Sequence, residues 1–371
     1  MSGATGMSGA TGMSGATGMS GATGMSGVTD MSGAAGAGEQ QQARGHRAVV
    51  TDAGRPLPVG TPTPGSVTIL PTSTALHEDA VRRAGGSLTD LGDDTRGIVW
   101  LDAGDPDGLQ AALTTTPGVT WVQLPFAGVD AFAHLIAEHG DRVLFTSAKG
   151  AYAEPVAEHA LALTLATLRV LQKRARTTTW SREPEGMSLY GRHVVLIGAG
   201  GIALEYLRLV APFDVRVTVV RRSPEAVPGA ARTVTTDQLD SVLPDADVVV
   251  VAAAMTSDTS KLLGAHQFAI MPDHARLVNI ARGGLVDTDA LVDALRSGAI
   301  TAAGLDVTDP EPLPDGHPLW SEPGALITPH QADTPEMVAP LLAERVGTNV
   351  RAFLGGDGTG FVGVVDPAAG Y

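Results

Sequence analysis

Residues 193–222 limit the fold more than any other stretch of this 371-residue chain. The segment begins with HVVLI (193–197), an apolar run that is short enough to form a buried strand. The glycine-rich run GAGGIA (198–203) follows, and then a stretch with helical spacing of apolar residues and a second apolar run, VRVTVV (215–220). A strand, a glycine-rich turn, a helix and a second strand in this order predict a β-α-β unit with a parallel pair of strands.

The glycine-rich run matches the pattern G-x-G-x-x-G/A, which is typical of dinucleotide-binding turns. Gly198 allows a tight turn, Gly200 lets the backbone approach a pyrophosphate, and Ala203 is small enough for close packing of the helix on the strand. Free N–H groups at the start of the helix favour the negative charge of a pyrophosphate. We therefore expect Gly198, Gly200, Gly201 and Ile202 to bind a dinucleotide. The alternative is a glycine-rich turn in another kind of α/β protein.

The residues after the second strand bear on which dinucleotide binds. An acidic residue about 20 residues past the glycines usually holds a ribose 2′-hydroxyl, whereas arginine accommodates a 2′-phosphate. Here Arg221, Arg222 and Ser223 follow the strand, and the first carboxylate comes at Glu225. We therefore expect NADP(H) as the cofactor and keep NAD as the alternative. The other alternative is that the two arginines are solvated at the end of the strand and bind no ligand.

Composition narrows the classes of function. The chain has no cysteine, which excludes disulfides, thiolate catalysis and cysteine-ligated metals, and we expect no metal site. Its net charge of −15 argues against nucleic acid or an anionic membrane as a partner. No apolar run is long enough for a membrane-spanning helix, and the N-terminus lacks the pattern of a secretory signal, so we expect a cytoplasmic protein.

The N-terminal segment differs from the rest of the chain. Residues 1–36 are six hexapeptides of the MSGATG type, and residues 37–46 are rich in glycine and glutamine. These repeats lack bulky apolar residues, so we expect residues 1–46 to form a disordered tail. A partner-binding role is the alternative.

The remaining chain predicts an α/β protein with two domains. Residues 66–147 alternate four apolar runs with three helical patterns, which indicates a parallel sheet without its own dinucleotide pattern. Ala153–Arg176 reads as one long helix between the domains. Six predicted strands then form a doubly wound sheet, and a last helix over 335–354 returns to the first domain. The six strands are 193–197, 215–220, 246–253, 275–281, 302–307 and 325–329.

Three polar residues follow the last three predicted strands. Arg282 follows ARLVNIA, Glu311 comes after GLDV, and His330 ends ALITPH. Ligands bind beyond the carboxyl ends of the strands in an open α/β sheet. An arginine can clamp a carboxylate and polarise the adjacent carbonyl, and a histidine kept charged by a carboxylate can protonate the carbonyl oxygen during hydride transfer. The three residues therefore suit the reduction of a 2-oxo acid.

Each residue alone has an ordinary structural explanation. Arg282 could cap a strand or pair with Asp287, and Glu311 could be a solvated residue of a proline-rich loop. His330 could be structural or exposed. Their position after three consecutive strands, behind a nucleotide-binding pattern, favours the catalytic interpretation.

Several motifs in order resemble the D-isomer-specific 2-hydroxyacid dehydrogenase family. They are GAGGIA, NIARGGLVDTDAL, GLDVTDPEPLP…HPLW and ITPH, together with AGVD (127–130) and KGAYAEPVAEHALAL (149–163). The resemblance implies a doubly wound Rossmann domain, residues 153–330, inserted into a smaller flavodoxin-like α/β domain, residues 47–152 plus 331–371. It also implies a homodimer, with its interface near the arm that carries Trp180 and the preceding helix.

The resemblance assigns roles to individual residues. It makes Arg282, Glu311 and His330 the catalytic triad. It implies that backbone groups of Phe126, Ala127 and Gly128 face the substrate carboxylate, and that Ala281 and Asp306 lie beside the cofactor, Asp306 near the nicotinamide carboxamide.

Other features separate members of the family. Arg221 stands where an acidic residue is common, as in glyoxylate/hydroxypyruvate reductase-like members with NADP(H). Glu311 argues against formate as the substrate, because formate dehydrogenases have Gln there. Lys149 stands where Asn is frequent, and AAAMTSDT (252–259) lacks a common proline. A phosphoglycerate or phosphite dehydrogenase, and a non-enzymatic protein that senses dinucleotides on the same scaffold, stay open as alternatives.

Overall fold

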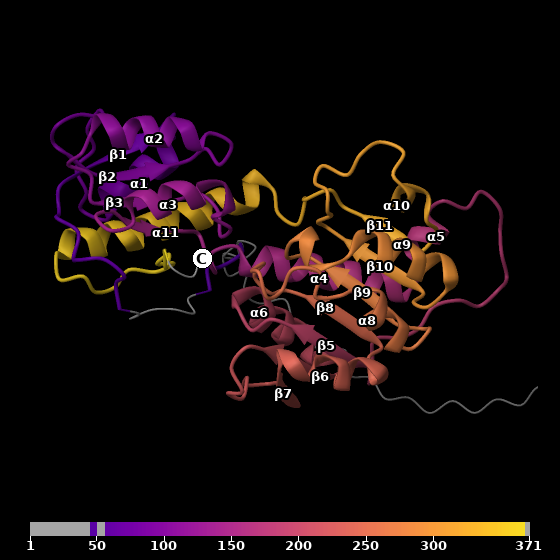
Figure 1. The fold of residues 1–371 in the computed structure, drawn as a ribbon. Helices are drawn as coiled ribbons and strands as arrows, with labels where there is room; N and C mark the ends of the chain where they lie inside the picture. The colour runs from indigo at the N-terminus through magenta and orange to yellow at the C-terminus, as the bar shows by residue number, and fades with distance from the viewer. Residues whose placement is uncertain (1–44, 50–55, 368–371) are drawn as a thin grey trace, which may run out of the picture. The chain divides into compact units, whose positions relative to one another are not determined.

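The structure is a computed structural model that describes residues 45–49 and 56–367. The repeats predicted to be disordered lie outside the described residues. Two parallel sheets with helices around them make up the described part (Figure 1), which confirms the predicted fold class.

The larger sheet has seven strands in the order β11-β10-β9-β8-β5-β6-β7, and all its strand pairs are parallel. This is the Rossmann order 3-2-1-4-5-6 with β11 added at one edge, and the order reverses between β5 and β8. The strands are β5 (His193–Ile197), β6 (Arg216–Arg221), β7 (Arg232–Thr235), β8 (Val248–Val251), β9 (Arg276–Asn279), β10 (Ala302–Leu305) and β11 (Ala325–Ile327). Ligands of such sheets bind at the point of reversal, beyond the carboxyl ends of the strands.

The prediction of six strands for this sheet is wrong by one. β7 pairs only with β6, at the edge of the sheet. Its sequence RTVT has a single fully buried apolar residue, Val234, so it lacks the apolar run that identifies a central strand.

Helices flank this sheet on the segments that connect its strands. For example, the helix over Thr288–Ser297 begins where Asp287 accepts a hydrogen bond from the N–H of Ala290 and ends at Gly298, which has φ +74°. The helices after β5 are α6 (Gly201–Val210), α7 (Leu239–Val242), α8 (Ala265–Ile270), α9 (Thr288–Ser297) and α10 (Pro318–Ser321), with short 3₁₀ turns at Ala211–Phe213, Thr236–Gln238, Leu243–Asp245 and Gly283–Leu285.

The smaller sheet has four parallel strands in the order β1-β2-β3-β4. Leu88 adds a parallel bridge to Val67 of β1, so the order becomes 2-1-3-4-5 with the second strand reduced to one bridge. This is the flavodoxin-like order. The elements are β1 (Ser66–Leu70), α1 (Ala75–Arg83), β2 (Thr95–Trp100), α2 (Pro106–Thr115), β3 (Trp121–Gln123), a 3₁₀ turn (Asp130–Phe132), α3 (Ala133–His139) and β4 (Leu144–Thr146).

The segment predicted as one helix over Ala153–Arg176 is two helices, so this prediction is wrong in its continuity. α4 (Ala153–Leu168) ends before Val170, which adopts a left-handed conformation with φ 50°, and α5 (Leu171–Arg174) follows. The carbonyl of Leu168 accepts a hydrogen bond from the N–H of Met187 at 2.8 Å. The N–H of Met187, in the irregular segment after α5, therefore satisfies a carbonyl that a further turn of α4 would otherwise have satisfied.

The last helix, α11 (Pro335–Gly355), packs against α1 and β3 of the smaller sheet (Figure 1). Buried amides join it to that sheet: Asn349 donates to Gln123 Oε1 at 2.7 Å and to the carbonyl of Val362 at 2.9 Å. Asn349 Oδ1 accepts from the N–H of Val362 at 2.8 Å, and the hydroxyl of Thr146 also donates to Gln123 Oε1. Segments far apart in sequence thus share one buried polar network.

Candidate active site

The glycine-rich turn leads from β5 into α6 at the carboxyl edge of the larger sheet. Gly198 has φ +113°, and a Cβ there would lie 2.5 Å from the carbonyl oxygen of Ala252, so both the conformation and the space require glycine. A Cβ on Gly200 would meet no protein atom within 4 Å. Gly200 is the N-cap of α6 and supplies no side-chain cap, so the first N–H groups of α6 are left for a ligand. These features fit the pyrophosphate of a dinucleotide.

A pocket of about 430 Å³ begins at this turn and combines residues of both sheets. It also holds Arg221, Arg222 and Ser223 after β6, and Arg282 after β9. The residues predicted to bind cofactor or substrate that line this pocket are Ala127, Gly128, Gly198, Gly200, Gly201, Ile202, Arg221, Arg222, Ser223, Ala281 and Arg282.

The side chain of Arg221 makes no hydrogen bond or ion pair within the described part of the chain, and it is only partly exposed. It stands at the end of β6, so its guanidinium is available at the edge of the pocket where the ribose end of a dinucleotide is expected.

Arg282 is held by the turn that follows β9. The buried amide of Asn279 donates to the carbonyl of Arg282 at 3.0 Å and accepts from the N–H of Ala281 at 3.1 Å. A Cβ on Gly283 would lie 1.9 Å from backbone atoms of Thr308, so this turn packs directly on the loop after β10. Asp287 caps α9 and pairs with Lys261 at 3.0 Å, which removes the alternative in which it pairs with Arg282.

His330 and Glu311 lie in contact. Nδ1 of His330 is 2.5 Å from Oε1 of Glu311. The backbone N–H of His330 donates to the carbonyl of Asp306 at 2.6 Å, and His330 has φ 53°, a left-handed conformation that is uncommon for a residue other than glycine. A carboxylate at this distance fixes the orientation of the imidazole ring. Glu311 therefore has a partner in His330, although both side chains are exposed.

Comparisons with known proteins agree with this geometry. Residues 159–332 match the family model described as D-isomer specific 2-hydroxyacid dehydrogenase, NAD binding domain. The human glyoxylate reductase/hydroxypyruvate reductase is 34% identical over 235 residues, which cover 60% of this chain and 70% of that protein. The chain belongs to this family. It is therefore an oxidoreductase of the NAD(P)-dependent 2-hydroxyacid dehydrogenase type.

Two further relatives extend the match. A Corynebacterium melassecola protein named "uncharacterized protein in proB 3'region" is 37% identical over 258 residues, which cover 68% of this chain and 84% of that protein. The solved D-isomer specific 2-hydroxyacid dehydrogenase of Xanthobacter autotrophicus Py2, in complex with NADPH and MES, superposes with a TM-score of 0.71 at 26% identity, over 83% of this chain and 100% of that chain.

The carboxylate of Asp306 is held by several hydrogen bonds within the chain. Its carboxylate is buried and accepts hydrogen bonds from the N–H groups of Gln331 (2.9 Å) and Ala332 (3.2 Å) and from the hydroxyl of Thr328 (2.8 Å). His159 of α4 lies 3.4 Å away. Burial would raise the pKa of Asp306, but the hydrogen bonds from His159, Gln331 and Thr328 outweigh it and lower the pKa. Asp306 thus fixes the loop that carries His330.

Four of the predicted site residues do not line the pocket: Phe126, Asp306, Glu311 and His330. Phe126 is partly exposed beside the ring of Tyr152, whose hydroxyl donates to the carbonyl of Pro125 at 2.6 Å. The catalytic and binding roles of these residues, and of those in the pocket, stay predictions.

No role is predicted from the sequence for several residues near the site. Asp130 and Met255 line the pocket, and His159 and Asp333 flank Asp306. Lys149, noted above for standing where Asn is frequent, also lines the pocket. Burial raises the pKa of Asp333, while the charge of His330 acts in the opposite sense. The motif AGVD contains the only signal for Asp130, since the resemblance draws attention to that run without assigning the carboxylate a role.

The described residues contain no group of three or more His, Cys, Asp or Glu side chains that could hold a metal ion. No helix in the described ranges has both the length and the apolar character needed to cross a membrane.

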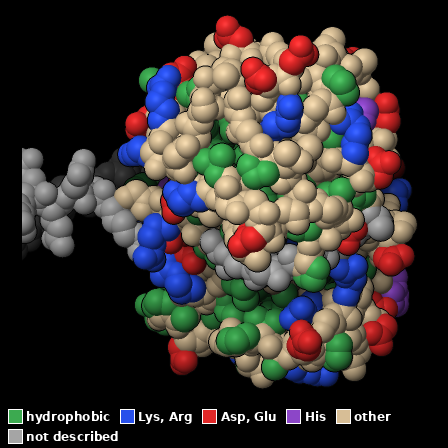
Figure 2. All heavy atoms as spheres, turned by 90° about the vertical axis from the view of Figure 1, so that its left-hand side faces the viewer, with side chains coloured by type: hydrophobic (Ala, Val, Ile, Leu, Met, Phe, Trp, Pro, Cys, Tyr) green, Lys and Arg blue, Asp and Glu red, His purple; other side chains and the backbone are tan. Residues whose placement is uncertain are grey.

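Figure 2 shows acidic and basic side chains intermingled on one face of the molecule.

Proposed function

We propose that this dehydrogenase is an NADP(H)-preferring reductase of small 2-oxo acids that also oxidises D-2-hydroxy acids. The observation that carries the proposal is the pocket in which Arg282 and the glycine-rich turn meet. Glyoxylate, hydroxypyruvate and bulkier 2-oxo acids are the candidate substrates.

Each catalytic residue has a role that its chemistry suits. The guanidinium of Arg282 binds the planar carboxylate of the substrate and polarises the adjacent carbonyl. When bound, the nicotinamide dinucleotide supplies the hydride. His330 donates a proton to the carbonyl oxygen, and Glu311 orients the imidazole, which their 2.5 Å contact supports.

The preference for NADP(H) rests on Arg221. Its side chain borders the pocket without a partner in the described part of the chain, and no acidic residue takes the place at the end of β6 that a ribose-binding carboxylate would need. A guanidinium there can make charge-assisted hydrogen bonds to a 2′-phosphate.

We also propose the domain division and assembly that the resemblance implies. Residues 47–152 and 331–371 would form the substrate domain and residues 153–330 the dinucleotide-binding domain, which the contacts of α11 with α1 and β3 support. A homodimer formed through the arm near Trp180 would cover a side chain that is 91% exposed in the described chain.

The test is a panel of 2-oxo acids assayed with both NADPH and NADH. We expect turnover of glyoxylate or hydroxypyruvate with NADPH, and a fall in kcat of about 10²–10⁴-fold in His330→Ala, the range for loss of a general acid. His266→Ala, which alters an exposed histidine of α8, is the matched control. Full activity in His330→Ala would remove this residue from the mechanism. Tight NADPH binding without turnover of any substrate, 3-phosphohydroxypyruvate included, would identify a binding protein instead.

A further inference from the structure

Arg282, the proposed carboxylate clamp, is already bound to a carboxylate of its own chain. Its Nε and Nη2 both donate to Oδ2 of Asp130 at 3.1 Å, and its Nη1 donates to the carbonyl of Ala281 at 2.8 Å. Asp130 lies 152 residues earlier, at the start of the 3₁₀ turn over Asp130–Phe132. The pair thus connects the loop after β3 with the loop after β9.

Gly128 leaves room for this pair. A Cβ on Gly128 would lie 1.6 Å from Nη2 of Arg282 and 3.2 Å from Oδ2 of Asp130, so a larger residue there would displace the guanidinium. Both charged side chains and Gly128 line the pocket. The side chain of Asp130 is 70% exposed and lines the pocket, so its carboxylate borders the space in which we propose that a substrate binds.

We propose that Asp130 is a specificity-determining residue that makes the site favour 2-oxo acids with a single negative charge over those with a second carboxylate or a phosphate. This inference rests on the proposed function, because it assigns a substrate class to the same site. One carboxylate of the substrate binds the guanidinium of Arg282, whereas a second anionic group would lie close to the negative charge of Asp130. Like charges at close range disfavour binding, and such a repulsive element is a common source of specificity.

Lys149 is the other charged side chain from the smaller sheet's side of the pocket. Its positive charge acts in the opposite sense to that of Asp130. Removing it in Lys149→Gln should lower the relative rate with dianionic substrates, whereas neutralising Asp130 should raise it. The two variants therefore separate the effect of charge from that of general damage to the pocket.

Asp130→Asn is the decisive variant, because an amide oxygen can still accept from Arg282 while the charge is gone. The readout is the ratio of kcat/KM for oxaloacetate, a dianion, to kcat/KM for hydroxypyruvate, a monoanion. A general change in activity cancels in this ratio. We expect the ratio to rise at least about tenfold in Asp130→Asn, and not in Asp141→Asn, which alters an exposed carboxylate of the same part of the chain. An unchanged ratio, or an equal fall with both substrates, would overturn the proposal.

A binding measurement keeps the inference separate from the proposed reaction. Oxalate and oxamate have similar size but carry two charges and one, respectively. With NADPH present, calorimetry should show that Asp130→Asn binds oxalate at least about tenfold more tightly relative to oxamate than the native protein does. This result without any 2-oxo acid turnover would contradict the proposed function alone. Turnover by the native protein without the shift would overturn the inference alone, and absence of binding by both proteins would overturn both.

Discussion

Single residues in the glycine-rich turn show how the chain leaves space for a ligand. Gly198 is needed because its φ is +113° and because the carbonyl of Ala252 lies where a side chain would be. Gly200 is different, since a Cβ there would meet no protein atom within 4 Å. The protein itself therefore explains the first glycine, and the pyrophosphate that we propose for this site would explain the second.

At the same scale, Arg221→Asp should change the cofactor preference. The substitution removes the guanidinium that we expect to bind the 2′-phosphate and introduces a carboxylate that repels it and suits a ribose 2′-hydroxyl. The ratio of kcat/KM for NADPH to that for NADH should fall at least about tenfold, the equivalent of 1.4 kcal/mol. Arg232→Asp, an exposed substitution on β7, is the control. An unchanged ratio would contradict the role of Arg221.

At the scale of elements, α11 is joined to the smaller sheet by polar groups as well as by apolar packing. Asn349 is fully buried and makes three hydrogen bonds, one to Gln123 on β3 and two to the backbone of Val362. Buried polar groups cost little when they are satisfied and much when one partner is lost. The network therefore specifies how the C-terminal segment docks on strands that formed more than 200 residues earlier in the chain.

Asn349→Leu should destabilise the protein by about 3 kcal/mol, because it leaves the buried N–H and carbonyl of Val362 without partners at about 1–3 kcal/mol each. The free energy of unfolding in urea measures this. Glu344→Gln, on an exposed position of the same helix, should change it by less than about 0.5 kcal/mol. Equal stability of the two variants would show that α11 docks by apolar contacts alone.

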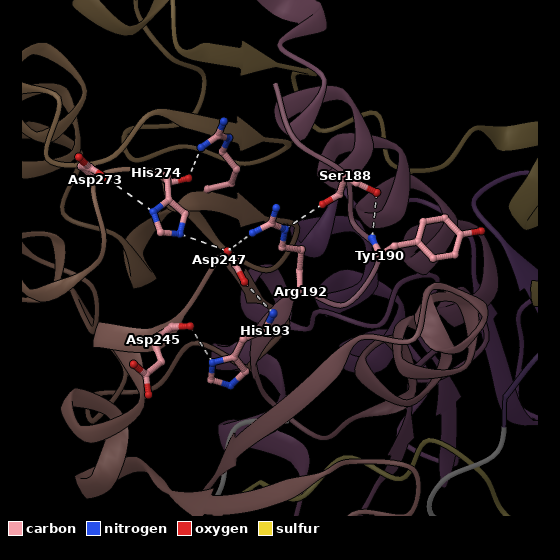
Figure 3. A network of polar contacts seen from close by, with 9 residues as sticks. Ser188, Tyr190, Arg192, His193, Asp245, Asp247, Asp273 and His274 are labelled. Atoms are coloured by element: carbon pink, nitrogen blue, oxygen red, sulfur yellow. Dashed lines mark hydrogen bonds and ion pairs between the residues drawn. The ribbon is translucent and has the colours of Figure 1, made fainter. Parts of the chain in front are cut away.

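At the scale of the whole molecule, the two ends of the larger sheet carry different kinds of polar groups. The carboxyl ends hold the pocket, and the amino ends hold a network centred on Asp247 (Figure 3). Asp247 accepts from the N–H of His193 at 2.8 Å and from Arg192 at 3.2 Å, and it lies 3.1 Å from Nε2 of His274. These contacts join residues at the amino ends of β5, β8 and β9. We therefore infer that this end of the sheet has a structural role.

The same network predicts how stability depends on pH. Nδ1 of His193 donates to the carbonyl of Asp245 at 2.9 Å, and burial is the largest cause that lowers the pKa of His193 below 6.5. The unfolded chain thus takes up a proton that the folded chain resists, so stability should fall as the pH drops from about 7 through 6.5 towards the lower folded pKa.

His193→Gln should reduce this loss, by up to about 1.4 kcal/mol per pH unit for one group. Thermal unfolding between pH 5 and 7 measures the slope, with the exposed His134→Gln as control. Burial also lowers the pKa of His77, so part of the slope should remain in the variant. Parallel curves for the native protein and His193→Gln would show that His193 takes no part.

Much of the fold could be predicted from local pattern. The bounds of β5 and the position of Arg282 after β9 follow from short apolar runs and the residues that end them. The missed strand β7 has no such signal, because it is an edge strand with one buried residue and forms by pairing with β6. The break at Val170 has none either, because a single left-handed residue depends on the segments packed around it. The same holds for the site. Its glycines and arginines could be predicted from short local motifs, whereas the pairing of Asp130 with Arg282 joins residues that are 152 positions apart in the sequence.

The sequence by itself determined the β-α-β turn, the residues that end three consecutive strands and the family to which they point, because backbone conformation and apolar periodicity are local properties. Only the tertiary structure decided which charges meet. Asp130 pairs with Arg282, Lys261 pairs with Asp287, and Asp306 accepts hydrogen bonds from the loop that carries His330. Electrostatic contacts depend on the distance between side chains in space, and that distance is set by how the two sheets and α11 pack.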